Sequence, residues 1–177
     1  MSTRHVFVDE SKRRDYLLVA SVHVGTEVAQ LRGVVRELLL PNQRFLHMKN
    51  ERDSRKRQIA AALVAAGVQA TVYRAGQGYD TEKQRRRACL EALVKDCADG
   101  SHTVVTLDQD ESLSRWDNQQ LIELVRAAGC RETMQYQHAP ARSELLLAVP
   151  DAIAWCWAKG GRWRQLIAAA VTEVREV

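Results

Sequence analysis

The chain has 177 residues, of which 46% are hydrophobic and 27% are charged, and its formal net charge at pH 7 is +4. These proportions are typical of a globular protein with a substantial core; they exclude a disordered chain, and no apolar run is long enough to cross a bilayer. The small excess of positive charge gives only a mild indication of an anionic partner.

The chain begins with a short apolar run that stops on two carboxylates. Residues 5–8 are Val- and Phe-rich and predict a buried strand, which places Asp9 at its C-terminal end and Glu10 just beyond it. Ligands and metals usually gather at that end of a strand in α/β folds. The stretch 9–15 is also typical of a solvated hairpin loop, and on this stretch alone a turn is the preferred interpretation. A second strand, antiparallel to the first, is predicted over 16–24.

Two helices and a short strand are predicted next. Apolar residues at helical spacing over 28–38 indicate a helix that is capped by Thr26 and ends at Pro41. Residues 44–49 favour a third strand, and a second helix is predicted from a cap at Asp53 to the glycine that follows residue 66.

The second half of the chain repeats the alternation of strands and helices. A strand is predicted over 68–73, and a capping-box pattern at 81–84 indicates a helix that continues to residue 97. A strand over 102–107 ends on Asp108, which repeats the pattern at Asp9: an apolar strand that finishes in carboxylates.

The C-terminal third completes an α/β pattern. Its predicted elements are a helix over 116–128, a strand over 132–138, a helix over 148–159 and a last amphipathic helix over 163–171. Strands that alternate with helices predict helices packed around a mixed sheet. No linker or repeat divides the chain, so residues 1–177 are expected to form a single domain.

The cysteines predict the compartment. Cys89, Cys97, Cys130 and Cys156 show no C-x-x-C spacing, which indicates neither a zinc site nor a disulfide framework. They are interpreted as buried thiols of a reducing environment, and the N-terminus carries no signal-like apolar run. A cytoplasmic protein is therefore expected, without a membrane partner.

Three acidic residues are candidates for a metal site. Asp9 and Asp108 end strands, and Asp151 lies in the first turn of a helix. Carboxylates brought together repel one another unless a cation lies between them, and Mg²⁺ or Mn²⁺ suits an all-oxygen site. For Asp151 the alternative is that it stabilises the helix dipole without any further function. The apolar residues 152–155 that follow it make a purely exposed role less attractive.

Several stretches together resemble a known family. Residues 8–11, 18–24 and 46–49, the acidic end at Asp108 and the segment 147–155 are similar to a bacterial family of unknown function with a ribonuclease-H-like fold. In that family the last segment usually reads Leu-Gln-x-Ala-Asp-x-Ile-Ala, and its acids are taken as a divalent-metal site for nucleic-acid hydrolysis. The resemblance implies an α/β fold in which helices flank a mixed ribonuclease-H-like sheet.

Carried over to this sequence, the resemblance implies a set of metal ligands. Asp9, Asp108 and Asp151 are the implied catalytic ligands of Mg²⁺ or Mn²⁺, with Glu10 or Asp110 as a fourth. Strand alternation predicts that Asp9 and Glu10 do not both face the site unless the strand bends.

The resemblance also covers a histidine. His47 and Lys49 match the family's His-containing strand, so His47 is a candidate general base or phosphate contact, and Lys49 a candidate nucleic-acid contact. A partly buried strand histidine explains His47 equally well. The sequence departs from the family pattern because Ala148 stands where Gln is usual, Pro150 replaces Ala, and no Gly follows Ser11.

Basic residues cluster at the starts of two predicted helices. Cations there oppose the helix macrodipole, and phosphate groups would compensate them, although solvated surface remains the default interpretation of each cluster. The residues selected as nucleic-acid contacts, besides Lys49, are Arg55, Lys56, Arg85 and Arg86.

Three tryptophans lie near the C-terminus. Trp155, Trp157 and Trp163 would stack on bases if they were exposed, but their spacing beside apolar residues favours core or subunit contacts, and with them a homodimer.

The leading prediction is therefore a divalent-metal-dependent nuclease or phosphodiester hydrolase that acts on DNA or RNA. The alternative is a catalytically inactive member of the same fold that binds nucleic acid or protein, which the altered segment around Asp151 motivates. No G-x-S-x-G motif, catalytic-cysteine signature or phosphate-binding glycine loop competes with these readings.

Overall fold

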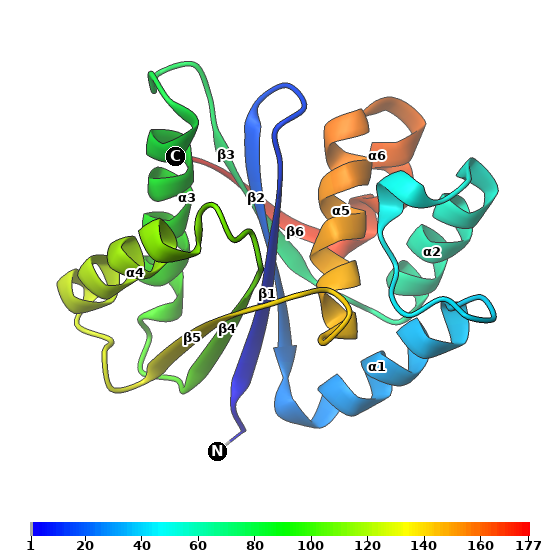
Figure 1. Ribbon diagram of the computed structural model, residues 1–177, viewed down its shortest axis with the longest axis horizontal. Helices are drawn as coiled ribbons and strands as arrows, with labels where there is room; N and C mark the ends of the chain where they lie inside the picture. Colours follow the sequence, from blue (N-terminus) through cyan, green and yellow to red (C-terminus); the bar gives the residue numbers. More distant parts are fainter. Residues whose placement is uncertain (1) are drawn as a thin grey trace.

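The computed structural model describes residues 2–177, and within them six strands form one mixed sheet with the order β5-β4-β1-β2-β3-β6 (Figure 1). The central pairs β1–β2 and β2–β3 are antiparallel, and the remaining pairs are parallel. The strands are β1 (Arg4–Ser11), β2 (Tyr16–Val24), β3 (Ala70–Ala75), β4 (Thr103–Asp108), β5 (Met134–Ala139) and β6 (Val171–Glu176).

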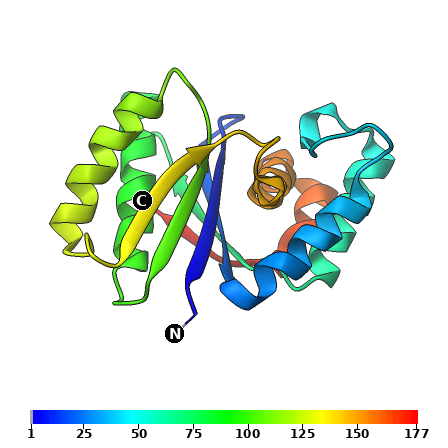
Figure 2. The same cartoon turned by 60° about the horizontal axis from the view of Figure 1, so that its bottom comes forward.

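Helices cover both faces of the sheet. In Figures 1 and 2, α3 and α4 lie on one side, and α1, α2, α5 and α6 lie on the other. The predicted mixed sheet flanked by helices is therefore confirmed. The helices are α1 (Gly25–Leu38), α2 (Asp53–Ala65), α3 (Glu82–Cys97), α4 (Ser114–Ala128), α5 (Ala148–Lys159) and α6 (Gly161–Ile167), with 3₁₀ turns at Met48–Asn50, Leu145–Leu147 and Ala168–Ala170.

Two hydrophobic cores fill the space between these layers. Side chains alternate across β1, so Phe7 packs into the core under α5, whereas Val6 and Val8 pack into the core under α3 and α4. The same alternation directs Asp9 toward α5 and Glu10 toward α3. The strand therefore separates two adjacent carboxylates onto opposite faces, as the alternation predicted.

The opening strand is longer than its apolar run. β1 continues through Ser11, which pairs with Leu17, and Asp9 pairs with Val19 inside the antiparallel ladder. The interpretation of 9–11 as part of a turn is therefore wrong, because β2 supplies hydrogen-bond partners up to that point. The strand predicted over 16–24 is confirmed.

The strand predicted over 44–49 is wrong. This segment is a loop that leads into a 3₁₀ turn at Met48–Asn50. Leu46 and Met48 are buried, which explains the apolar pattern. Both edges of β1 and of β2 are already paired, and the 3₁₀ turn of this segment contacts α5 and pairs with no strand of the sheet.

The last predicted helix ends early. α6 stops at Ile167, and residues 171–176 form the edge strand β6, parallel to β3. Without β6 the outer edge of β3 would expose unpaired backbone groups. Val171 therefore belongs to the sheet and not to an amphipathic helix.

The predicted N-terminal cap of α3 is confirmed, whereas those of α1 and α2 are not. Thr81 and Gln84 form the predicted capping box of α3, with the Gln84 N–H donating to Thr81 Oγ1 at 3.1 Å. Thr26 and Asp53 lie inside α1 and α2 and do not cap them.

All four cysteines are free and buried. Across residues 2–177, none of the helices has the length and apolar character needed to cross a bilayer.

Candidate active site

Two of the predicted acids lie at the carboxyl ends of neighbouring strands. β1 and β4 are parallel neighbours in which Val8 pairs with Leu107, so Asp9 and Asp108 follow this pair on adjacent strands. Leu107 faces the core under α3 and α4, so Asp108 points to the opposite face, the α5 face to which Asp9 also belongs. Their carboxyl groups therefore share one face at the carboxyl end of two parallel strands.

The third acid comes from α5, which crosses this face. The backbone N–H of Met48 donates a hydrogen bond to Asp151 Oδ2 at 2.8 Å, and His47 Nε2 lies 3.6 Å from Asp151 Oδ1. Asp151 also lies close enough to Asp9 for their charges to interact. Asp151 thus connects the loop between α1 and α2 to the carboxyl ends of β1 and β4.

The pKa values of the three acids report their crowding. Burial, followed by the charges of Asp151, Glu10 and Asp108, holds the pKa of Asp9 well above its usual value. Burial and the charges of Glu10 and Asp151 raise the pKa of Asp108 to about 6. Burial also raises the pKa of Asp151, although His47 and the Met48 N–H oppose this. The cluster therefore favours either bound protons or a cation.

This crowding predicts a pH dependence of stability. An acid with a raised pKa in the folded state keeps a proton that the unfolded chain releases, so its effect destabilises the fold as pH rises. In the absence of divalent ions, the free energy of unfolding is expected to fall between about pH 4 and the Asp108 pKa of about 6. Urea unfolding of wild type and Asp108→Asn across this range checks the sign. Asp108→Asn should show a smaller decline, and a steeper decline would contradict the assignment.

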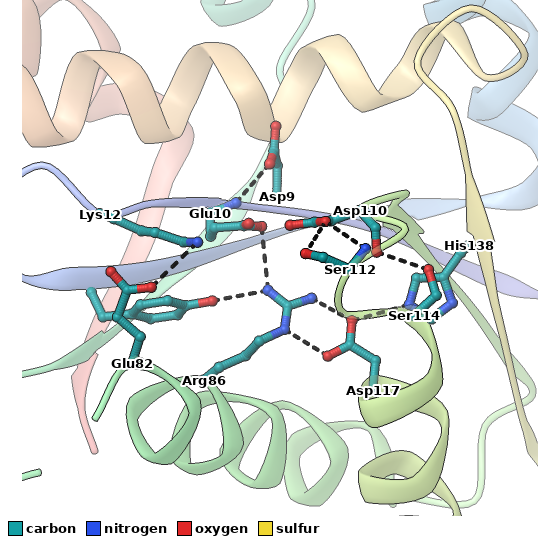
Figure 3. A network of polar contacts seen from close by, with 11 residues as sticks. Asp9, Glu10, Lys12, Glu82, Arg86, Asp110, Ser112, Ser114, Asp117 and His138 are labelled. Carbon is teal, nitrogen blue, oxygen red and sulfur yellow. Dashed lines mark hydrogen bonds and ion pairs between the residues drawn. The ribbon is translucent and has the colours of Figure 1, made fainter. Parts of the chain in front are cut away.

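Two other predicted ligands are engaged elsewhere. In Figure 3, Asp9 points toward α5, whereas Glu10 lies on the other side of β1, where Glu10 Oε2 is 3.3 Å from Arg86 Nη1. Asp110 Oδ1 accepts hydrogen bonds from Ser112 N–H at 3.0 Å and from its hydroxyl at 2.6 Å, and these bonds lower the pKa of Asp110. Asp110 thus organises the turn before α4. Within residues 2–177, no three His, Cys, Asp or Glu side chains are already grouped as a metal centre.

A buried arginine organises the opposite face of β1. Arg86 is 3% exposed and donates to both carboxylate oxygens of Asp117 at 2.7 Å and to the Tyr16 hydroxyl at 2.9 Å. Figure 3 shows this arrangement, with Glu10 and His138 completing it. His138 Nε2 is 3.1 Å from Asp117 Oδ2. The prediction that Arg86 contacts nucleic acid is wrong in this structure, because its guanidinium is enclosed by protein partners.

Asp117 and His138 were not predicted as members of a polar network. Burial alone would raise the pKa of Asp117, but its hydrogen bonds with His138 and Arg86 lower it. One signal in the sequence points to its burial: Asp117 precedes Leu121 and Leu124 at helical spacing, so it lies on the apolar face of α4. A carboxylate on that face requires a buried partner.

Two more predicted nucleic-acid contacts are occupied within the fold. Lys56 is 9% exposed, and its Nζ lies 4.3 Å from the ring centroid of Trp155. Arg55 donates to the Leu38 carbonyl and pairs with Glu51 at 3.5 Å. Both side chains mainly hold α2 against its neighbours, so the prediction for Lys56 as a surface contact is wrong.

The remaining two contacts differ from each other. Arg85 is partly exposed and donates to the carbonyl oxygens of Gly76 and Tyr79, at 3.3 and 2.8 Å, so it holds the β3–α3 loop. Lys49 is exposed and follows His47 in the same segment. Of the five predicted contacts, Lys49 is thus the cation best placed to meet a ligand at the carboxylate cluster.

Trp155 and Trp163 pack against each other and do not form an open stacking surface. Trp155 and Trp163 meet edge to face with ring centroids 4.9 Å apart, and all three tryptophans pack against the core under α5. These intramolecular contacts account for the aromatic pattern, so they give no support to the predicted homodimer.

Comparison with known proteins identifies the fold and nothing finer. No family model matches the chain, and no curated protein matches it. A chain in the solved PCNA:RNase HII complex from Archaeoglobus fulgidus is similar, with a TM-score of 0.57, 12% sequence identity, and coverage of 90% of this chain and 73% of that chain. The predicted ribonuclease-H-like fold is confirmed, whereas membership of the bacterial family of unknown function stays a prediction.

Proposed function

We propose that this chain, which has an RNase H-type fold, is a divalent-metal-dependent nuclease or related phosphodiester hydrolase. One observation carries the proposal: Asp9, Asp108 and Asp151 come from three separate elements and crowd together at the carboxyl end of the parallel β1–β4 pair, with raised pKa values. Crowded, buried carboxylates with raised pKa values are poor structural elements, but they suit a cation site.

The donor chemistry of this cluster fits Mg²⁺ or Mn²⁺. Carboxylate oxygens are the preferred ligands of both ions, and a bound cation would relieve the repulsion that, together with burial, raises the pKa values of Asp9 and Asp108. Such an ion supplies charge stabilisation for a reacting phosphodiester and activates water. Because the described residues hold no preformed group of three ligands, binding requires side-chain rotation, oxygens from the substrate, or both.

The neighbouring residues orient the cluster. The Met48 N–H fixes one oxygen of Asp151, and the His47 imidazole lies beside the other. The second ring nitrogen of His47 is buried and has no hydrogen-bond partner within residues 2–177. This geometry favours His47 as a positioning residue for Asp151, and Lys49 as the exposed cation that meets the phosphate backbone.

Metal binding tests the proposal without a choice of substrate. Calorimetric titration of Mn²⁺ into wild type is expected to show saturable binding, and Asp9→Asn and Asp151→Asn should lose it. Asp80→Asn, an exposed acid away from the cluster, is the control and should bind as wild type does. Equal binding by wild type and both cluster variants would refute the proposed site.

A second candidate is a non-catalytic member of the fold that binds nucleic acid. Glu10 and Asp110, the two candidates for a fourth ligand, are engaged by Arg86 and Ser112, which favours an incomplete metal site. This alternative predicts salt-sensitive binding that survives EDTA, together with no cleavage in Mg²⁺ or Mn²⁺. Turnover in either metal would exclude it.

A further inference from the structure

A cavity of about 330 Å³ lies on the same face of the sheet as the carboxylate cluster. It is formed where the β1–β2 turn, the end of β3 and β6 meet the ends of α5 and α6. Its walls include Arg14, Leu17, Arg74, Trp157, Arg164 and Val174. Nothing in the proposed metal chemistry accounts for this cavity.

The cavity lies next to the candidate active site. Leu17 pairs with Ser11, two residues beyond Asp9 on β1, and its side chain belongs to the core under α5. Trp157 lies six residues after Asp151 on α5, a rise of about 9 Å along the helix axis. The cavity and the carboxylate cluster are thus about 9 Å apart along α5.

One wall is a rigid pair of flat groups. The Arg164 guanidinium lies 4.8 Å from the ring centroid of Trp157 and donates two hydrogen bonds, at 3.1 and 2.7 Å, to the Trp157 carbonyl oxygen. These contacts hold a cation and an aromatic ring together in a fixed arrangement. Such a pair offers both a stacking surface and a positive charge.

The other arginines differ in how their charge is balanced. Arg74 pairs with Asp15 and with Glu176, at 2.7 and 3.0 Å, so it mainly braces the wall. Arg14 is exposed, and within residues 2–177 it has neither an ion pair nor a side-chain hydrogen bond. Arg14 and Arg164 therefore leave the cavity with an excess of positive charge.

We propose that this cavity binds one nucleotide of a single-stranded segment of the substrate, with the phosphate on Arg14 and Arg164 and the base against the Trp157–Arg164 pair. A base reaches such a surface only when it is free of a complementary strand. A volume of about 330 Å³ suits one such unit and excludes a paired duplex. This inference rests on the proposed nuclease function.

Equilibrium binding of labelled oligonucleotides tests the cavity alone. Fluorescence anisotropy is measured in EDTA, so that no metal-dependent cleavage occurs, with short single-stranded DNA, single-stranded RNA and a DNA duplex. Wild type should bind single strands more tightly than duplex, and the DNA and RNA arms decide which strand the cavity prefers. Arg14→Ala should reduce the slope of log affinity against log salt by about 0.7, the loss of one phosphate contact on a single strand.

Matched variants make the outcome decisive. Arg164→Ala removes half of the stacking pair and should weaken single-strand binding by about 5- to 150-fold. Arg131→Ala, an exposed arginine between α4 and β5, is the control and should behave as wild type does. Equal losses in Arg14→Ala and Arg131→Ala, or competition by polyglutamate as effective as that by oligonucleotide, would overturn the assignment.

The test separates this inference from the proposed function. If Asp9→Asn abolishes cleavage while Arg14→Ala binds as wild type does, the nuclease stands and the cavity assignment fails. If wild type binds single strands through Arg14 but cleaves nothing in Mn²⁺, the cavity assignment stands and the nuclease fails. Absence of oligonucleotide binding by wild type overturns the cavity assignment outright.

Discussion

Asp9→Asn is expected to lower Mg²⁺- or Mn²⁺-dependent cleavage of nucleic acid by at least about 100-fold. Mutating a residue that only hydrogen-bonds to a metal ligand typically lowers metal affinity or activity by about 10- to 100-fold, and loss of a ligand itself should have at least the larger effect. Asp9 belongs to the cluster with Asp108 and Asp151, and Asn keeps its shape while removing the charge that holds a cation. The measurement is single-turnover cleavage of labelled single-stranded and hybrid substrates in each metal. Asp80→Asn should cleave as wild type does.

The same substitution should leave the fold intact. Asp9 is 8% exposed, and the raised pKa of its carboxyl group shows that the charged form is disfavoured there. A neutral amide removes this repulsion, so without divalent ions Asp9→Asn should be at least as stable as wild type at neutral pH. Cleavage that persists in both Asp9→Asn and Asp151→Asn would contradict the assignment, since it would require a site elsewhere.

Arg86→Ala is expected to lower the free energy of unfolding by about 3–5 kcal/mol, the usual result of breaking a buried ion pair. The substitution leaves Asp117, which is 1% exposed, without its bidentate partner, and it also removes a donor from Tyr16 and the cation beside Glu10. Urea unfolding followed by circular dichroism measures the change.

The neighbouring Arg87 provides a matched control on the same helix. It forms an exposed ion pair with Glu123 at 3.3 Å, so Arg87→Ala should change the free energy of unfolding by no more than about 1 kcal/mol. Removing both partners in Arg86→Ala/Asp117→Ala should destabilise less than the sum of the two single changes, because no unpaired charge remains between them. A loss in Arg86→Ala as small as that in Arg87→Ala would mean that the guanidinium is solvated.

Elements with strong local signals were predictable from the sequence. The strand over 16–24 and the helix over 148–159 match β2 and α5, and the capping box at 81–84 correctly located the start of α3. In each case the apolar period and the boundary residues lie within the element itself. Local propensity and burial then favour the same structure.

Segments whose structure depends on a distant partner were not predictable in this way. Residues 44–49 have the apolar content of a strand, but they pair with no strand of the sheet and form a loop and a 3₁₀ turn. Residues 171–176 continue an amphipathic pattern, yet they pair with the edge of β3. In both cases the decision rests on which backbone groups remain unpaired elsewhere in the fold.

The candidate site was likewise predictable only in part. Asp9, Asp108 and Asp151 were selectable because Asp9 and Asp108 follow apolar runs and Asp151 lies in the first turn of a helix, and these positions are properties of the sequence. Which other polar residues join them was decided by the tertiary structure: β1 turns Glu10 to the opposite face, where Arg86 holds it.

The sequence by itself determined the alternation of strands and helices and the positions of the acids within it, because side-chain period and capping act over a few residues. The tertiary structure alone decided that Arg86 is buried while Lys49 is exposed, and that Asp117 and His138 complete a network. Charged residues look alike in a sequence, and their roles differ only through the partners and the burial that packing supplies.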